Sequence, residues 1–270
     1  MHLHAIQLNM PKKTVKTLVI SGASSGIGLS LARYYLERGA TVAAFARRGE
    51  LLQALEADFP KRVFCYVLDV RDASAIKEAA DDFIARVGKP DVVIANAGVS
   101  VGTLSEYAED VDAFQQVLDI NVIGMVKTFQ PFIAAMCEEK RGTLVGIASV
   151  AGFRGLPGSG AYSASKAAAI SYLESLRVEM RGSGVRVMTI CPGYIRTPMT
   201  ASNPYPMPFM LEADEAARRM ADAIESGTAF TVIPWQMGLV GRVLKLLPRW
   251  SYDRLFVKAP RKPRSPRSLP

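Results

Sequence analysis

The sequence predicts an α/β fold in which a doubly wound parallel sheet of about seven strands is covered by helices on both faces. Two observations support this prediction. Short apolar segments rich in β-branched residues alternate along the chain with amphipathic helical segments, a pattern typical of strands buried on both faces of a parallel sheet. The first apolar segment ends in a glycine-rich turn that leads directly into a helix, as expected where a buried strand is followed by a covering helix.

The strands are expected where apolar residues run together for a few positions and then stop at a turn. They are Lys16–Ser21, Thr41–Ala46, Val63–Leu68, Asp91–Ala95, Thr143–Ala148, Val185–Cys191 and Phe230–Ile233. The helices between them are Gly26–Arg38, Leu51–Phe59, Ala73–Val87, Val111–Met136, Tyr162–Arg181 and Ala213–Ser226. Gly39 follows the first helix at the position where glycine commonly stops a helix. Right-handed crossovers then place ligands at the carboxyl ends of the strands.

One domain accounts for most of the chain. With 270 residues, of which 49% are hydrophobic and 21% charged, the protein can bury a core of its own. We expect an N-terminal extension over residues 1–15, the sheet domain over 16–234, an amphipathic segment over 235–257 and a basic disordered tail over 258–270. We find no apolar stretch typical of a spanning helix and no signal peptide, so a cytoplasmic location is predicted.

Cysteine and histidine usage gives no sign of a disulfide framework or a metal centre. Cys65, Cys137 and Cys191 lie far apart with no spacing typical of metal ligands, which indicates a reducing compartment. His2 and His4 stand among the first residues, where a frayed segment with two ligands rarely holds an ion, so no metal site is predicted.

The net charge of +8 belongs to one end of the chain. From Trp235 onward there are nine Lys and Arg residues and one acid, Asp253, so the rest of the chain is neutral. A neutral domain does not favour nucleic-acid binding, and no aromatic residue stands among the last basic ones. No nucleic-acid partner is therefore predicted.

The glycine-rich turn reads Gly22-Ala23-Ser24-Ser25-Gly26-Ile27-Gly28. Its first glycine permits a sharp exit from the strand, and the other two let the backbone approach a pyrophosphate, whose charge a helix N-terminus favours. The spacing differs from that of the GxGxxG fingerprint, and a purely structural turn is the alternative interpretation.

The end of the second strand indicates which dinucleotide such a turn would hold. An Asp or Glu normally stands there to bind the ribose 2′-hydroxyl, but this chain has Arg47 and Arg48 after Ala46. No acid repels a 2′-phosphate, and two guanidinium groups can hold one. This predicts NADP(H) in preference to NAD(H); the alternative is that the two arginines only begin a solvated helix.

Three residues near the fifth strand form a candidate catalytic set. Ser149 follows the strand, and Tyr162 and Lys166 are four residues apart at the start of the next helix, so they share one helical face. A lysine ammonium one turn away would lower the pKa of the tyrosine, and a serine hydroxyl at a strand end could polarise a carbonyl. Taken alone, a Tyr–Lys pair on a helix is usually only part of an amphipathic surface.

Together these motifs resemble the short-chain dehydrogenase/reductase family in its single-domain form, from Lys16 to Ile233. The turn resembles the family's TGxxxGIG, with Ser21 in place of threonine, and Ala95 stands where the family's NNAG has its first asparagine. The resemblance implies a Rossmann-type fold and an oxidoreductase that interconverts a carbonyl and a secondary alcohol. A non-catalytic NAD(P)-sensing protein of the same fold is the alternative, which the complete catalytic set disfavours.

The resemblance also implies a role for each matching residue. The catalytic set is Asn121, Ser149, Tyr162 and Lys166, with Tyr162 as the acid/base, Ser149 holding the substrate oxygen and Asn121 holding a water of the proton relay. The cofactor-binding set is Gly22, Ser24, Ser25, Gly26, Ile27, Gly28, Arg47, Arg48, Asp69, Val70, Asn96, Ala97, Gly98, Tyr162, Lys166, Pro192, Gly193, Ile195 and Thr197. Family relatives form dimers or tetramers through the helices expected at 111–136 and 162–181, so a homo-oligomer is expected.

Two further segments bear on substrate and partners. The segment 199–211 is rich in Pro, Met and aromatic residues, so it is either an apolar flap over a small-molecule substrate or a loop that packs on the domain. The segment 235–257 alternates apolar and basic residues, which is typical of a helix at a membrane interface. We favour the simpler interpretation that it packs on the domain or on a second subunit.

Overall fold

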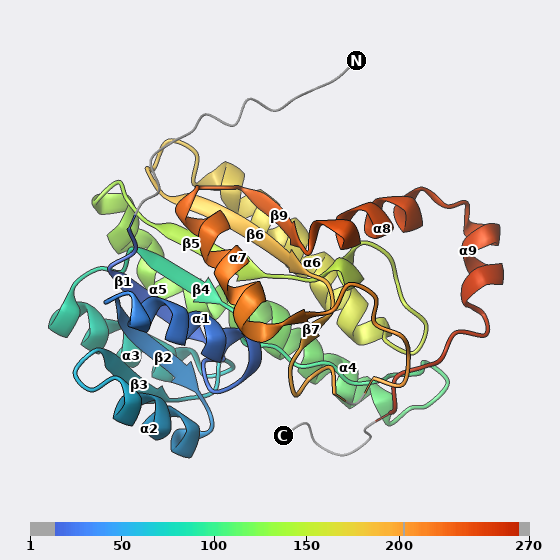
Figure 1. Ribbon diagram of the computed structural model, residues 1–270, viewed down its shortest axis with the longest axis horizontal. Coiled ribbons are helices and arrows are strands. Elements are labelled where there is room, and N and C mark those ends of the chain that lie inside the picture. The colour runs from blue at the N-terminus through green and yellow to red at the C-terminus, as the bar shows by residue number, and fades with distance from the viewer. Residues whose placement is uncertain (1–13, 202, 265–270) are drawn as a thin grey trace.

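The computed structural model describes residues 14–201 and 203–264, so the predictions for His2, His4 and residues 265–270 lie outside the described part (Figure 1). Seven parallel strands form one sheet in the order β3-β2-β1-β4-β5-β6-β9. The strands are β1 (Thr17–Ser21), β2 (Thr41–Ala46), β3 (Val63–Val67), β4 (Val92–Ala95), β5 (Thr143–Ile147), β6 (Arg186–Pro192) and β9 (Phe230–Ile233). This confirms the predicted doubly wound parallel sheet.

Helices cover both faces of the sheet (Figure 1). On one face lie α1 (Gly26–Glu37), α2 (Gly49–Asp58) and α7 (Ala213–Glu225). On the other lie α3 (Ala73–Val87), α5 (Gly124–Glu138) and α6 (Gly160–Glu179). In β1, Leu18 and Ile20 pack in the core on the α1 face of the sheet, and Val19 packs in the core on the α6 face, because successive side chains of a strand point to opposite faces. All three are fully buried, which is why the strand is apolar throughout.

The strand order reverses between β1 and β4. From β1 the chain continues through β2 to β3, and it then returns to place β4 on the opposite side of β1. The loops that follow β1 and β4 therefore diverge and leave a crevice at the carboxyl ends of these strands, which is where ligands bind in sheets of this type.

The long helix expected at 111–136 is present but interrupted. It consists of α4 (Asp110–Leu118), the π-helical turn η1 (Asp119–Ile123) and α5. By length and composition alone the stretch Asp110–Glu138 could cross a membrane. Its Phe129, Phe132 and Met136 side chains are buried in the core beneath the sheet, as expected of a helix that belongs to a folded domain.

The chain beyond β6 differs from the sequence prediction in detail. A short two-stranded sheet, β7 (Ile195–Arg196) and β8 (Leu211–Glu212), brackets the Pro- and Met-rich segment and was not predicted. The amphipathic segment forms two helices, α8 (Trp235–Leu246) and α9 (Arg249–Phe256), since Pro248 ends the first.

Residues 258–264, which belong to the tail predicted to be disordered, contact the domain through specific side chains. Arg264 donates to both carboxylate oxygens of Asp110 at 2.9 and 3.0 Å, and its guanidinium lies 3.5 Å from the centre of the Tyr107 ring. Lys262 is buried and donates to the Ser100 hydroxyl at 3.0 Å. These charge-assisted contacts fix a segment whose proline-rich basic composition, taken alone, predicts disorder.

Candidate active site

A cavity of about 510 Å³ lies at the carboxyl ends of β1 to β4. It gathers most of the residues predicted to bind a cofactor. Those that line it are Gly22, Ser24, Ser25, Gly26, Ile27, Arg47, Arg48, Asp69, Val70, Asn96, Ala97, Gly98 and Thr197. Its other lining residues are Met199, which begins the predicted flap segment, and six residues that the sequence analysis did not assign to the cofactor site: Phe45, Ala46, Leu68, Val99, Ile120 and Pro198. Most of these directly adjoin predicted residues at strand ends, so the rule that ligands bind at those ends could have found them.

The glycine-rich turn forms one end of the cavity. Gly22 and Gly26 have φ values of 73° and 55°, which disfavour any residue with a Cβ atom. A Cβ atom added to Gly28 would lie 2.2 Å from the Gly22 carbonyl oxygen. The first turn of α1 therefore packs directly on the end of β1, and its N-terminus, which has no side-chain cap, adjoins the cavity. This backbone cradle fits a pyrophosphate.

The two arginines after β2 lie on the wall beside this turn. Arg48 donates to the hydroxyls of Ser24 and Ser25 at 2.9 and 2.6 Å. Arg47 lies 3.8 Å from the Asp69 carboxylate, whose pKa is lowered mainly by the hydrogen bond from the Arg71 side chain. Two guanidinium groups thus stand at the wall of the cavity, and Asp69 is already bound by Arg71.

The residues after β4 connect the turn to the rest of the site. The Asn96 amide group donates to the carbonyl oxygens of Ser21 and Gly22 at 3.1 and 3.3 Å, so it fixes the end of β1. A Cβ atom on Gly98 would lie 3.2 Å from Asn121 Oδ1 and 3.6 Å from Lys166 Nζ. The cofactor wall and the predicted catalytic residues are therefore in direct contact.

Asn121 sits in the π-helical turn between α4 and α5 and is fully buried. Its Oδ1 accepts from the Val99 N–H at 2.8 Å, and its Nδ2 donates to the Val99 carbonyl and the Ser165 hydroxyl, both at 3.0 Å. The side chain therefore joins the loop after β4 to α6. Turns of this kind occur frequently at functional sites.

Ser149, Tyr162 and Lys166 come together at the carboxyl end of β5. The Ser149 hydroxyl lies 3.4 Å from the Pro192 carbonyl oxygen and accepts from the Ala151 N–H at 3.1 Å. Lys166 Nζ lies 5.7 Å from the centre of the Tyr162 ring and donates to the Ile147 carbonyl at 2.9 Å. The strand end thus holds the lysine, and the helical turn holds the tyrosine beside it.

Burial shifts the pKa values of both Tyr162 and Lys166. Burial raises the pKa of Tyr162, while a hydrogen bond with the Ser149 side chain lowers it. Burial also lowers the pKa of Lys166 to about 8. The sequence suggested that the lysine would pull the tyrosine pKa down, but Lys166 is not among the groups that shift it here. Burial prevails over the Ser149 hydrogen bond, so Tyr162 is held in its protonated form.

The segment after β6 lines the cavity at one point and packs against the protein core and α8 at others. Thr197 lines the cavity next to Gly26, whose added Cβ atom would lie 3.1 Å from Thr197 Cγ2. Six residues predicted to bind the cofactor are not among the lining residues of the described cavity: Gly28, Tyr162, Lys166, Pro192, Gly193 and Ile195. Ile195 is buried in the core, and a Cβ atom on Gly193 would lie 2.6 Å from Met237 Cγ, so this glycine allows α8 to pack closely.

Comparisons with known proteins agree with this architecture. Residues 16–206 match the family model for short chain dehydrogenases. The chain is 41% identical over 247 residues to an uncharacterized oxidoreductase of Myxococcus xanthus, an alignment that covers 90% of this chain and 97% of that protein. It is 35% identical over 181 residues to a 2-dehydro-3-deoxy-L-rhamnonate dehydrogenase (NAD(+)) of a Sphingomonas species, covering 67% of this chain and 72% of that protein. The chain belongs to the short-chain dehydrogenase/reductase family.

A solved structure of the same family supports the fold directly. A short chain dehydrogenase from Burkholderia cenocepacia, in complex with NADP, superposes with a TM-score of 0.78 at 26% identity, covering 92% of this chain and all of that one. The protein is accordingly a short-chain oxidoreductase with a Rossmann-type fold, and its family binds NAD(P). The close-packed glycine cradle described above fits such a dinucleotide.

Proposed function

We propose that the protein is an NADPH-dependent oxidoreductase that interconverts a carbonyl compound and a secondary alcohol, with Tyr162 as its acid/base. The observation that carries this proposal is the meeting of Ser149, Tyr162 and Lys166 at the end of β5, in contact through Gly98 and Asn121 with the cofactor wall. Each group has the chemistry that reduction of a carbonyl requires.

The proton transfer follows from the state of each side chain. A bound nicotinamide cofactor supplies the hydride that the carbonyl carbon accepts. Tyr162, kept protonated by burial, donates its proton to the carbonyl oxygen, and the Ser149 hydroxyl donates a hydrogen bond to the same oxygen. Lys166 has a pKa of about 8, so it is mostly cationic at neutral pH and offsets the charge that develops on the tyrosine oxygen.

Proton resupply involves Asn121. We expect this residue, which bridges the loop after β4 and α6, to hold a water that links Lys166 to solvent. In alcohol oxidation the same groups act in reverse, with Tyr162 accepting the proton.

The test is NADPH oxidation by the purified protein with a panel of ketones and aldehydes, followed by absorbance. Tyr162→Phe removes the proton donor and should lower turnover at least about 100-fold, within the range that general acid catalysis contributes, while NADPH binding persists. Tyr172→Phe, on the same helix and half-buried, is the matched control and should retain turnover. Turnover by Tyr162→Phe equal to that of the control would refute the assigned role.

The preference for NADP(H) rests on Arg47 and Arg48. Replacing both with Ala, together with Ala46→Asp, removes the cations and adds an acid at the end of β2. Loss of a charge-assisted phosphate contact weakens binding by about 10- to 100-fold, so the ratio of NADPH to NADH affinity should fall by that factor. Arg38→Ala lies outside the cavity and should leave the ratio unchanged. An unchanged ratio in the triple variant would contradict the assignment.

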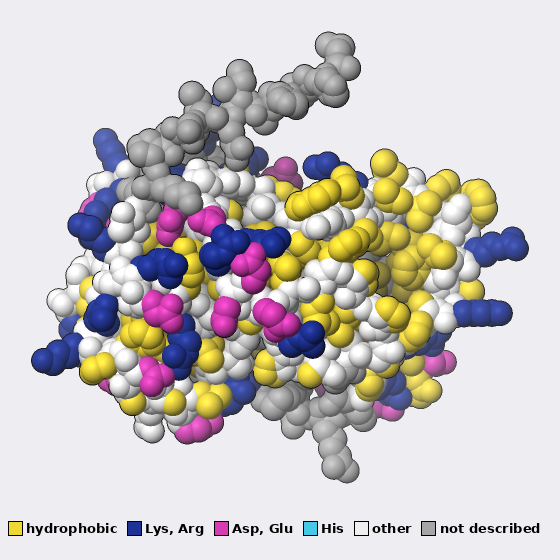
Figure 2. Space-filling model, viewed as in Figure 1, with side chains coloured by type: hydrophobic (Ala, Val, Ile, Leu, Met, Phe, Trp, Pro, Cys, Tyr) yellow, Lys and Arg dark blue, Asp and Glu magenta, His cyan; other side chains and the backbone are white. Residues whose placement is uncertain are grey.

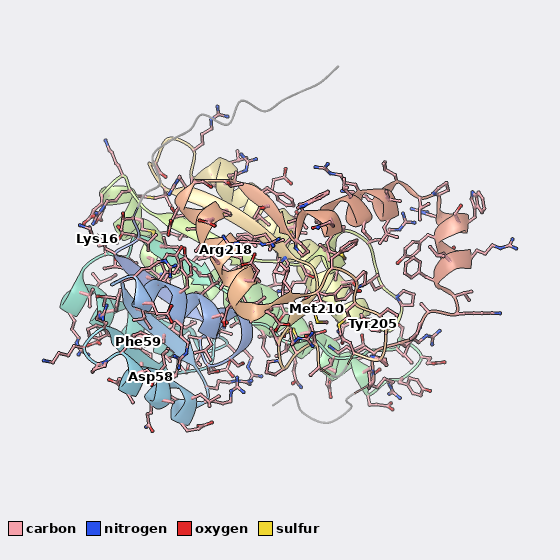
Figure 3. The ribbon with its side chains drawn as sticks, in the orientation of Figure 1. Lys16, Asp58, Phe59, Tyr205, Met210 and Arg218 are labelled. Carbon is pink, nitrogen blue, oxygen red and sulfur yellow. The ribbon has the colours of Figure 1, made fainter. Side chains whose placement is uncertain are left out.

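The segment between β7 and β8 is proposed as a flap over an apolar substrate. Tyr205 is within electrostatic range of Tyr162, and burial, Tyr194 and Tyr162 together raise its pKa to about 12. Figure 3 shows Tyr205 and Met210 on the side of the molecule away from Asp58 and Phe59. Tyr205→Ala should raise the KM for bulky apolar ketones more than that for small ones; equal effects on both would contradict the flap.

The protein is further proposed to form a homodimer or homotetramer in the cytoplasm. Val111 on α4 and Val178 on α6 are exposed by 65% and 59%, which supports burial of these helices against a second subunit. Light scattering of the protein in solution tests this point, and a monomer at micromolar concentration would contradict it.

A further inference from the structure

Helices α8 and α9 present a row of apolar side chains to solvent. We call this row the C-terminal apolar face; it consists of Trp235, Leu239, Val243, Leu246 and Trp250. Leu246 is 83% exposed and Trp250 is 72% exposed, which are the highest values among the large apolar side chains described. Their spacing of three and four residues puts the α8 members on one side of that helix. Figure 2 shows hydrophobic side chains gathered at this end of the molecule.

The opposite side of the two helices is already occupied by the domain. A Cβ atom on Gly241 would lie 2.3 Å from the Phe153 ring, so α8 packs tightly there. Arg154 donates to the carbonyl oxygens of Leu244 and Leu247 at 2.7 and 2.8 Å. The Tyr252 hydroxyl donates to the Gly155 carbonyl at 2.5 Å and secures α9. The exposed face is therefore held outward, and the domain covers only the other side.

Basic side chains surround the C-terminal apolar face. Five exposed cations lie on or next to the two helices, and none forms an ion pair with another described residue: Arg242, Lys245, Arg249, Arg254 and Lys258. The single acid of these helices is Asp253. Two copies of this face brought together would oppose like charges, whereas a surface of anionic lipid would complement them.

We propose that the C-terminal apolar face docks peripherally on an anionic membrane surface. Amphipathic helices bind in this way when leucine and tryptophan enter the interface and a basic rim contacts lipid head groups. Tryptophan at both ends of the row is consistent with this environment, because its ring favours the level of the head groups.

Docking would bring the substrate side of the domain to the bilayer. The two helices rest on the loop after β5, through Phe153 and Gly155, and on Gly193 after β6. The segment that follows α9 reaches the loop after β4 at Ser100. The docking surface therefore adjoins the three loops that begin beside Ala95, Ser149 and Pro192, where the substrate is expected.

The test is flotation of the full-length protein with vesicles. One set contains phosphatidylcholine alone, and the other contains about three parts phosphatidylcholine to one part phosphatidylglycerol. The protein should float with the anionic vesicles and far less with the neutral ones. Leu246→Gln combined with Trp250→Gln should reduce the bound fraction about tenfold, because two of the most exposed interfacial anchors are lost. Val67→Gln, at a 64% exposed site on β3 at the other end of the molecule, should change nothing (Figure 1).

A charge variant separates the two contributions. Arg242→Gln combined with Arg249→Gln should weaken binding to anionic vesicles several-fold and leave the weak binding to neutral ones unchanged. Lys77→Gln combined with Arg86→Gln, both on α3, removes the same net charge and should have no effect. Equal loss with both pairs would overturn the assignment, since net charge rather than this face would then control binding.

Two further results would overturn the proposal. One is failure of the wild-type protein to float with either vesicle while it still binds NADPH. The other is dissociation of an oligomer by Leu246→Gln and Trp250→Gln without any vesicle binding, which would assign the face to a second copy of the chain. NADPH binding by every variant shows that the fold is intact and keeps this test separate from that of the proposed function.

Discussion

The position of Gly152 makes the catalytic geometry sensitive to a single methyl group. This residue ends the short 3₁₀ turn η2 (Val150–Gly152), which follows Ser149. A Cβ atom built on it would lie 2.7 Å from the Lys166 carbonyl carbon and 2.8 Å from its oxygen. These are backbone atoms of α6, so no side-chain rotation can make room.

Gly152→Ala must therefore separate the turn from the helix. Carbon atoms in contact lie at about 3.5 Å or more, so the two elements have to move apart by roughly 0.5–1 Å. Overpacking of this size costs about 1–3 kcal/mol of stability. It also displaces Ser149 relative to Tyr162 and Lys166, and a misplacement of about 1 Å can lower turnover by about 100-fold.

Gly155 provides the control within the same loop. A Cβ atom there meets nothing within 4 Å. Gly155→Ala should therefore keep its turnover, whereas Gly152→Ala should lose between about 10- and 100-fold in kcat with NADPH binding retained. The assay is NADPH oxidation at saturating ketone, together with thermal unfolding. Turnover of Gly152→Ala within twofold of Gly155→Ala would refute the reasoning.

Two further predictions concern buried charge. The pKa of Lys166 is about 8 in the folded protein, below the ordinary value of a lysine in the unfolded chain. Its buried charge therefore destabilises the fold at pH values below 8. This cost decreases as pH rises from 8 to the ordinary lysine pKa, because over that range the folded protein binds fewer protons than the unfolded chain. Lys166→Met should raise Tm at pH 7 and lose this advantage by pH 10; a constant difference in Tm across that range would contradict it. Asp110→Asn should release the segment ending at Arg264, seen as faster trypsin cleavage after Lys258 and Arg261. The amide NH2 group cannot accept from the guanidinium, so one of the two bonds is lost and the other becomes a neutral acceptor's. Asp112→Asn, at an exposed acid of the same helix α4 that makes no contact with Arg264, is the control, and equal cleavage of both variants would refute the role of Asp110.

The sheet and its order of elements could be predicted because their signals are local. Each buried strand is apolar throughout, and each covering helix repeats its apolar positions at helical spacing. The glycine-rich turn could be predicted for a similar reason, since Gly22 and Gly28 occupy positions where a Cβ atom does not fit. Most of the residues predicted to bind cofactor line one cavity for the same reason: they follow neighbouring parallel strands.

Other features depend on contacts between distant parts of the chain. Residues 258–264 contact the domain through acceptors such as Asp110 and Ser100, and no local composition reveals those acceptors. The direction of the Tyr162 pKa depends on burial by the whole domain, which outweighs the hydrogen bond from Ser149. Likewise, the apolar segment 235–257 gave no sign of which side would pack, since that is decided by Phe153 and Gly193.

The most direct test of the central claim is titration of the purified protein with NADPH and with NADH, followed by the fluorescence of the reduced nicotinamide. The proposed function predicts saturable binding of both, with NADPH tighter by about 10-fold or more, since Arg47 and Arg48 line the cavity and are proposed to hold its extra phosphate. Failure to bind either nucleotide would contradict the assignment of the glycine cradle and of the chemistry built beside it.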